Sequence, residues 1–205
     1  MAIKKYKPTS PVRRHMSTPT FEEITKTTPE KRLVKRFKKN AGRNNQGKVT
    51  TRHQGGGAKY MYRMVDFSQL DKLNIQGQVT SVEYDPGRSA YIMLVTYKDG
   101  EKRYHIAPEG IKVGAKIETR AKTKAKVGSR MMVKNIPVGY QIHNVELNPG
   151  QGGKMVKSAG SYATVVSLEG ERAQIQMPSG EVRLVQKECY ATIGIVSNID
   201  RKSVV

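Results

Sequence analysis

From residue 60 onward, short apolar segments alternate with turn residues, and this spacing suits strands better than long helices. Asp99-Gly100 lies between two of these segments, and Asp-Gly in that position is a strong signal for a tight β-hairpin. No window in this region carries the apolar repeat of a long helix. The pattern therefore predicts an all-β fold.

The apolar segments form two series, and we expect each series to build a small closed or nearly closed barrel. The first series has predicted strands at residues 60–67, 75–84, 90–97, 102–107 and 115–119. Residues 120–128 then form a basic linker. The second series has predicted strands at residues 131–136, 143–147, 162–168, 172–177, 181–185 and 191–196.

The positive charge is concentrated at the start of the chain. Of a net charge of +20, residues 1–63 supply +14, with 17 Lys and Arg against 3 Asp and Glu. A polyanion is the natural partner, and nucleic acid is the commonest one, with an anionic membrane surface as the alternative. Residues 1–40 have few periodic apolar residues, so we expect a basic arm that orders on its anionic partner, with a short basic helix at Glu30–Lys39. We expect no membrane span and no signal peptide, because no apolar run approaches about 18 residues.

Two glycine-rich stretches lie beside basic residues. Gly55–Gly57 precedes Lys59, and Gly150–Gly153 precedes Lys154 and Lys157. Neither stretch has the glycine spacing of a P-loop or of a dinucleotide-binding loop. They are either flexible turns or places where the backbone approaches phosphates, and the neighbouring basic residues favour the phosphate interpretation.

The sequence shows no motif or residue spacing that is typical of a catalytic or metal-binding site. The four histidines are scattered, and none has metal-ligand spacing with another His, Cys or carboxylate. The single cysteine, Cys189, excludes an internal disulfide, and we expect it to be a small buried residue. We therefore expect no enzyme activity, no metal site, no cofactor and no small-molecule substrate.

Tyrosines stand next to basic residues at several points, and neighbouring side chains in a strand point to opposite faces. We expect Tyr84 and Tyr104 to fill a barrel core. The basic residues that we expect to face outward, toward nucleic acid, are Arg63, Arg88, Lys102 and Arg103.

Two neighbouring motifs, Asn40–Thr50 and Arg52–Gly57, closely resemble the start of the family of the second protein of the large ribosomal subunit. The family pattern continues at Val82–Ala90, Asp99–Tyr104, Asn135–Gly139, Val145–Gly150, Ser158–Gly160, Pro178–Arg183 and Cys189–Gly194. The resemblance runs from residue 1 to about residue 198, and the opening residues look like the bacterial or organellar branch.

The resemblance implies a division of the chain into a basic N-terminal arm (1–59), an OB-like RNA-binding barrel (60–120), a basic linker (121–128), an SH3-like barrel (129–197) and a final segment (198–205). It implies a structural role in the large subunit, in the cytoplasm or an organellar matrix. The implied partners are large-subunit rRNA, neighbouring ribosomal proteins and the small subunit. The implied role is to support subunit association and the architecture around the peptidyl transferase centre, with any structural magnesium held by the rRNA. A free OB-type RNA chaperone or translation factor is the alternative.

The resemblance also implies which residues contact rRNA. A family arginine after the Asp-Pro turn corresponds to Arg88, and a second one corresponds to Lys157, which keeps the charge but lacks the planar guanidinium fork. The residues expected to contact rRNA are Arg43, Asn44, Asn45, Arg52, His53, Gly55, Gly56, Gly57, Lys59, Arg63, Arg88, Lys102, Arg103, Lys134, His143, Lys154, Lys157 and Arg183.

The family pattern continues into a further basic glycine-rich loop, whose histidine is linked to peptidyl transfer. Up to Asn198 this chain follows the family, whereas Arg201–Val205 does not. We expect residues 200–205 to be non-native, because one frame of a common sequencing adapter encodes the same six residues, with a truncated paralogue as the alternative. Reading the source DNA beyond codon 199 tests this expectation.

Overall fold

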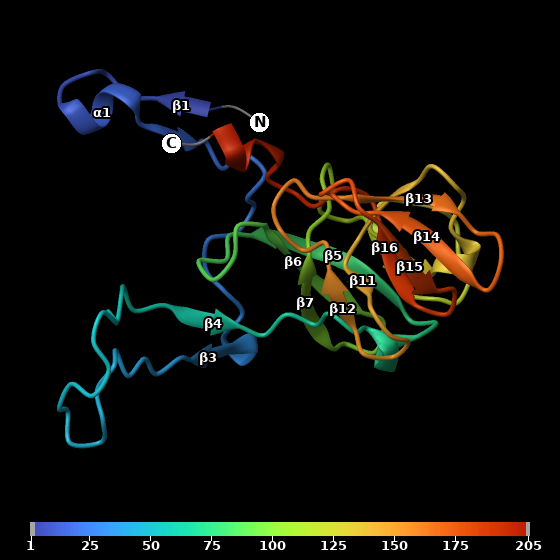
Figure 1. The fold of residues 1–205 in the computed structure, drawn as a ribbon, viewed down its shortest axis with the longest axis horizontal. Helices are drawn as coiled ribbons and strands as arrows, with labels where there is room; N and C mark the ends of the chain where they lie inside the picture. Colours follow the sequence, from blue (N-terminus) through green and yellow to red (C-terminus); the bar gives the residue numbers. More distant parts are fainter. Residues whose placement is uncertain (1–2, 204–205) are drawn as a thin grey trace.

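The computed structural model describes residues 3–203, and β-strands dominate this range (Figure 1). The first series forms an antiparallel four-stranded sheet in the order β7-β6-β5-β8. Its strands are β5 (Gln76–Glu83), β6 (Ile92–Tyr97), β7 (Lys102–Ile106) and β8 (Lys116–Glu118). Gly100 turns the chain from β6 to β7 at a φ of +82°, which glycine adopts without strain. The predicted hairpin at Asp99-Gly100 is confirmed.

The second series forms an antiparallel six-stranded sheet in the order β15-β14-β13-β10-β16-β9. Its strands are β9 (Arg130–Met132), β10 (Gln141–His143), β13 (Ala163–Ser167), β14 (Arg172–Gln176), β15 (Val182–Gln186) and β16 (Tyr190–Ile193). The short 3₁₀ helices of the body are η2 (Leu70–Lys72) and η3 (Val133–Asn135), and a further one, η4 (Ile199–Ser203), lies next to the N-terminal arm. Each sheet buries its own apolar cluster, in keeping with the expected all-β succession of an OB-like and an SH3-like barrel.

A two-stranded ribbon, β11 (Val145–Glu146) with β12 (Gly153–Met155), supplements the larger sheets. Strand β12 falls in a stretch for which the sequence predicts a turn or a phosphate-binding loop. Gly153 has room only for a hydrogen, because a Cβ there would lie 1.9 Å from Oδ1 of Asn144. Close packing inside the protein therefore explains this glycine.

The two large sheets are in direct contact. Isolated bridges join Pro108 to Val196 and Thr119 to Arg130. The segment before the first sheet also reaches the ribbon, because the backbone N–H of Gly153 donates to the carbonyl of Phe67 at 2.9 Å. Side chains that follow strands of different sheets can therefore meet.

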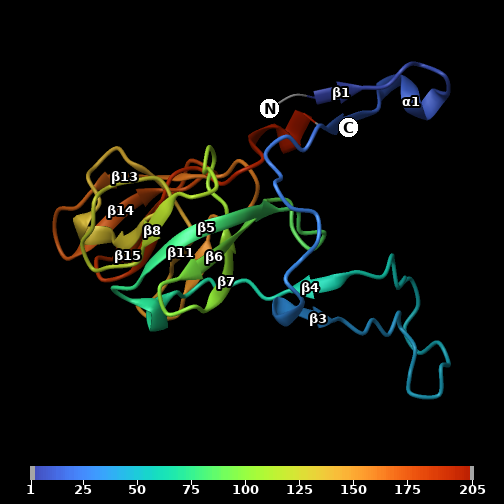
Figure 2. The same cartoon turned by 180° about the vertical axis from the view of Figure 1, so that it is seen from behind.

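The basic arm forms two projections on the same side of the β body (Figures 1 and 2). The first contains β1 (Ile3–Lys5), α1 (Pro11–His15) and β2 (Ser17–Pro19), and the second contains η1 (Lys31–Leu33), β3 (Val34–Arg36) and β4 (Met61–Arg63). Between them the arm runs along the end of β5, where Thr25 donates its backbone N–H to the carbonyl of Val82 at 3.0 Å.

Two predictions for the arm and its junction are wrong. Residues 60–67 do not form one continuous barrel strand, because Met61–Arg63 pairs with β3 of the arm, although Val65 forms a parallel bridge to Tyr104 of the barrel strand β7. The segment Glu30–Lys39 is not a helix but a 3₁₀ turn followed by that strand. Leu33 packs against the buried cluster that contains Tyr104, whereas Phe37 is exposed on the projection, so the apolar residues of this segment do not share one helical face.

The burial predictions have mixed outcomes. Tyr104 and Cys189 are both fully buried, as predicted. Tyr84 is 45% exposed and does not lie in the core, because β5 ends at Glu83 and the Tyr84 ring turns outward against the edge of Phe21. Among residues 3–203, no helix is long and apolar enough to cross a membrane.

Candidate nucleic-acid interface

The β3–β4 loop, which we define as residues 37–60, is exposed and basic. It extends away from the body in both views (Figures 1 and 2). From residue 31 to residue 65 the chain contains 11 Lys and Arg and no Asp or Glu. The sequence-predicted contacts that lie exposed in this loop are Arg43, Asn45, Arg52, His53, Gly55, Gly57 and Lys59, while Asn44 and Gly56 are half-buried. The loop contains no carboxylate that could compete with phosphates for these cations.

Hydrogen bonds within the β3–β4 loop give it a defined shape. The side-chain oxygen of Asn44 accepts the backbone N–H groups of Gln46 and Lys48 at 3.0 and 2.9 Å. The carbonyl of Gly42 accepts the N–H groups of Thr50 and Thr51 at 2.9 and 3.1 Å. Asn44 therefore organises the turn, and its Oδ1 is already engaged.

Arg88 and Lys157, which follow strands of different sheets, meet at the ring of Phe67. The Arg88 guanidinium carbon lies 5.4 Å from the ring centroid, and Lys157 Nζ lies 4.3 Å from it. Both distances are within the cation–π range. We call these three residues the Phe67 cluster. The two positions that the family resemblance singles out are thus brought together in space.

The electrostatics of the Phe67 cluster favour an anion. Burial, and then repulsion by Arg88 and Lys154, lower the pKa of Lys157 below its usual value. Asp85 offsets part of the charge, because its Oδ2 accepts a hydrogen bond from Arg88 Nε at 2.6 Å. A phosphate between the two cations would relieve their mutual repulsion and would pair with both.

Two predicted contacts are buried and do not belong to this interface. Arg63 is 7% exposed, with Nη1 lying 3.6 Å from Oδ1 of Asp85, because its strand pairs with β3 and turns the side chain inward. His143 is 1% exposed, and its Nδ1 lies 2.8 Å from the carbonyl of Gly194. Burial lowers the pKa of His143 to about 4, so the ring is neutral at pH 7.

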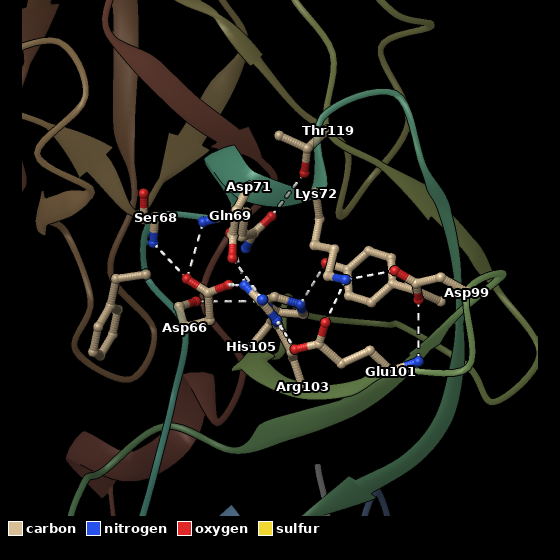
Figure 3. Close-up of polar contacts among 12 residues, drawn as sticks. Asp66, Ser68, Gln69, Asp71, Lys72, Asp99, Glu101, Arg103, His105 and Thr119 are labelled. Carbon is tan, nitrogen blue, oxygen red and sulfur yellow. Dashed lines mark hydrogen bonds and ion pairs between the residues drawn. The ribbon is translucent and has the colours of Figure 1, made fainter.

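Arg103, another residue expected to contact rRNA, has its guanidinium held by three carboxylates (Figure 3). Its Nε, Nη1 and Nη2 lie 2.8, 2.8 and 2.6 Å from oxygens of Glu101, Asp66 and Asp71 respectively. Burial opposes ionisation of Asp66, but hydrogen bonds from the Gln69 backbone and from Arg103 hold its pKa below the usual range. Arg103 ties β7 to the segment that precedes β5, and its charge is already neutralised.

The remaining predicted contacts are exposed but are not gathered at one place. Lys102 lies 3.4 Å from Glu30, Lys154 donates to the side chain of Gln151 at 2.8 Å, and Arg183 pairs with Glu181 at 3.2 Å. Lys134 is exposed on η3. Within residues 3–203, no hydrogen bond or ion pair joins Lys134 or Arg183 to the β3–β4 loop or to the Phe67 cluster.

Sequence reasoning missed the residues that support the interface. Phe67 was expected in a barrel strand, and nothing in its neighbourhood in the sequence indicates a cation on either side. Asp85 is 1% exposed and contacts both Arg63 and Arg88, a role that we did not expect from the sequence. The Asp-Pro-Gly sequence was the only signal that could have indicated this carboxylate.

The described part of the chain holds no group of three or more His, Cys, Asp or Glu placed to bind a metal ion. What the geometry does offer is fixed positive charge beside aromatic rings and exposed backbone. Such an arrangement binds phosphates and bases.

Comparison with known protein families adds an independent finding. Residues 30–119 match the family model described as "Ribosomal Proteins L2, RNA binding N-terminal domain". Residues 126–205 match the model described as "Ribosomal Proteins L2, C-terminal domain". The chain belongs to the ribosomal protein L2 family. It is thus a large-subunit ribosomal protein of an RNA-binding, structural family, and its place is in the ribosome.

Membership in the ribosomal protein L2 family fits the distribution of the two basic features. The match to the RNA-binding domain includes the whole β3–β4 loop, Phe67 and Arg88. Lys157 lies in the match to the C-terminal domain. The Phe67 cluster therefore draws its cations from both matched regions.

Proposed function

We propose that this chain binds large-subunit rRNA through two surfaces, the β3–β4 loop and the Phe67 cluster. The observation that carries the proposal is the meeting of Arg88 and Lys157 at Phe67, at centroid distances of 5.4 and 4.3 Å. The two cations follow strands of different sheets and are held beside one ring, an arrangement that suits a phosphate of a folded RNA better than a flexible strand.

The proposal extends to the role of the chain in the subunit. Bound at these surfaces, it supports subunit association and the architecture around the peptidyl transferase centre, next to neighbouring ribosomal proteins. The division at residues 1–59, 60–120, 121–128, 129–197 and 198–205 is part of this proposal. The two matched regions, which leave 120–125 between them, support the placement of the linker.

The test is a salt titration of binding to large-subunit rRNA by the full chain. Each phosphate contact adds about 0.7 to 0.9 to the slope of log affinity against log salt. We expect Arg88→Gln and Lys157→Gln each to reduce affinity and to lower the slope by about one such step. Lys98→Gln, an exposed lysine in the β6–β7 hairpin, is the charge-matched control.

Two outcomes of this titration would contradict the proposal. A flat salt response of the unmodified chain would exclude phosphate binding as the main source of affinity. Equal effects of Lys98→Gln and Arg88→Gln would mean that net charge, and not the Phe67 cluster, determines binding.

A further inference from the structure

We propose that the base of the second projection is a pocket for one unpaired nucleotide of the rRNA, whose base stacks on Phe37. This inference rests on the proposed function and specifies which feature of the RNA the β3–β4 loop recognises. The pocket is the hollow between the two sides of the projection, lined by residues 36–39 and 56–61. We call it the Phe37 hollow.

Two aromatic rings form one side of the Phe37 hollow. Phe37 and Tyr60 are stacked, with ring centroids 6.5 Å apart and an interplanar angle of 19°. Lys39 Nζ lies 4.5 Å from the Tyr60 centroid. Phe37 remains 56% exposed, so part of its ring is free to take a third planar group.

The backbone of the hollow is shaped to leave space next to these rings. Gly57 adopts a φ of +61°, and a Cβ there would lie 3.3 Å from Lys39 Nζ. The Lys39 ammonium is held by the carbonyl of Ala58 at 3.3 Å. The absence of a side chain at Gly57 thus keeps the lysine accessible from the hollow, which gives this glycine a role beyond that of a flexible turn.

Charge identifies the occupant as a nucleotide. The exposed side chains of Arg36, Lys38 and Lys59 line the hollow, and the loop has no carboxylate. An aromatic platform surrounded by cations matches a base with its phosphates. A paired base hides its faces in the helical stack, so only an unpaired or extruded nucleotide can present a face to Phe37.

Binding of the full chain to large-subunit rRNA, and to a single-stranded adenosine hexanucleotide that carries one 2-aminopurine, tests the inference. We expect the fluorescence of 2-aminopurine to be quenched on binding, because the base stacks on Phe37. Phe37→Ala should abolish the quenching and weaken rRNA binding roughly 5- to 100-fold, with an unchanged salt slope, since stacking releases no counterions. Phe37→Trp should retain the quenching. Val49→Ala removes an apolar side chain that is 54% exposed in the same loop, and it is the control expected to change neither readout.

The outcomes separate this inference from the proposed function. If the unmodified chain does not bind rRNA, the proposed function itself fails. If it binds rRNA, but Phe37→Ala retains both affinity and quenching, the Phe37 hollow is not a nucleotide pocket while the proposed function stands. The same holds if rRNA binding survives Phe37→Ala and the hollow is found cross-linked to a neighbouring protein in the subunit.

Discussion

Gly42 holds the β3–β4 loop in a conformation that other residues rarely adopt. Its φ is +69°, and its carbonyl accepts two backbone N–H groups from across the loop. A Cβ at this position would lie 2.3 Å from the carbonyl oxygen of Thr51. The loop has no apolar core of its own, so this crossing of two backbone segments is one of the few features that fix its shape.

We therefore expect Gly42→Ala to open the loop, with a strain of about 1–3 kcal/mol. The result should be faster hydrogen exchange at the amides of Thr50 and Thr51 and weaker rRNA binding, with little change in the melting temperature of the body. Gly47→Ala is the matched control, because Gly47 also has a positive φ, of +82°, but a Cβ added there would have no neighbour within 4 Å. Equal effects of the two substitutions would show that the contact with Thr51 is unimportant.

Among strands, β7 is joined to the segment before β5 by ion pairs of Arg103 as well as by a backbone hydrogen bond, in which the N–H of Asp66 donates to the carbonyl of Tyr104 at 2.8 Å. Arg103 on β7 bridges Asp66 and Asp71, and Lys72 pairs with Asp99 and Glu101 in the same group (Figure 3). Arg103→Gln would leave several carboxylates close together without their main cation. We expect the free energy of unfolding to fall by about 1–3 kcal/mol, because hydrogen bonds between charged groups are lost. Urea denaturation measures this change.

The control for Arg103→Gln is its neighbour on the same strand. Lys102→Gln removes an exposed ion pair of 3.4 Å and should change stability by no more than about 0.5 kcal/mol. Arg103→Gln should leave the salt slope of rRNA binding unchanged, in contrast to Arg88→Gln. A reduced slope would mean that Arg103 also contacts phosphate.

The predictability of the strands follows from their local pattern. In β14, buried Ala173 and Ile175 alternate with exposed glutamines, and such a strand can be predicted from period two alone. β3 and β12 have three residues each, too few to show a period, and β3 also depends on a partner strand more than twenty residues away, so no local pattern predicted them. The same limit applies to the site. The sequence identified Arg88 and Lys157, but it did not separate them from Arg63 and Arg103, which pair with Asp85 and with Asp66 and Asp71, carboxylates more than twenty residues away.

For the molecule as a whole, two buried histidines make stability depend on pH. Burial is the first cause that lowers the pKa of His105 and of His143, each to about 4. An unfolded histidine has a pKa near 6.5, so between about pH 6.5 and 4 the unfolded chain binds more protons than the folded one. The stability that the two neutral histidines contribute is therefore fully present above that pH range and is lost as the pH falls through it.

We expect each histidine to lower the free energy of unfolding by about 3 kcal/mol at pH 4 relative to pH 7. Urea midpoints measured at pH 7, 6, 5 and 4 check this, and the fall between pH 6 and 5 should precede the titration of most carboxylates. His53→Gln, at an exposed position in the β3–β4 loop, should leave the profile unchanged. Midpoints that stay constant from pH 7 to 5 would contradict the assignment.

Phe67 also makes the distance between two cations depend on how the sheets of the body pack together. Its ring contacts both Arg88, which follows β5, and Lys157, which follows β12. The packing of the sheets against each other therefore sets the distance between the guanidinium and ammonium groups. The affinity for a ligand that needs both cations is therefore thermodynamically linked to the packing of the sheets. Bound RNA would then stabilise the contact between the two barrels. A substitution at their contact, far from any phosphate, would be detected as a change in affinity.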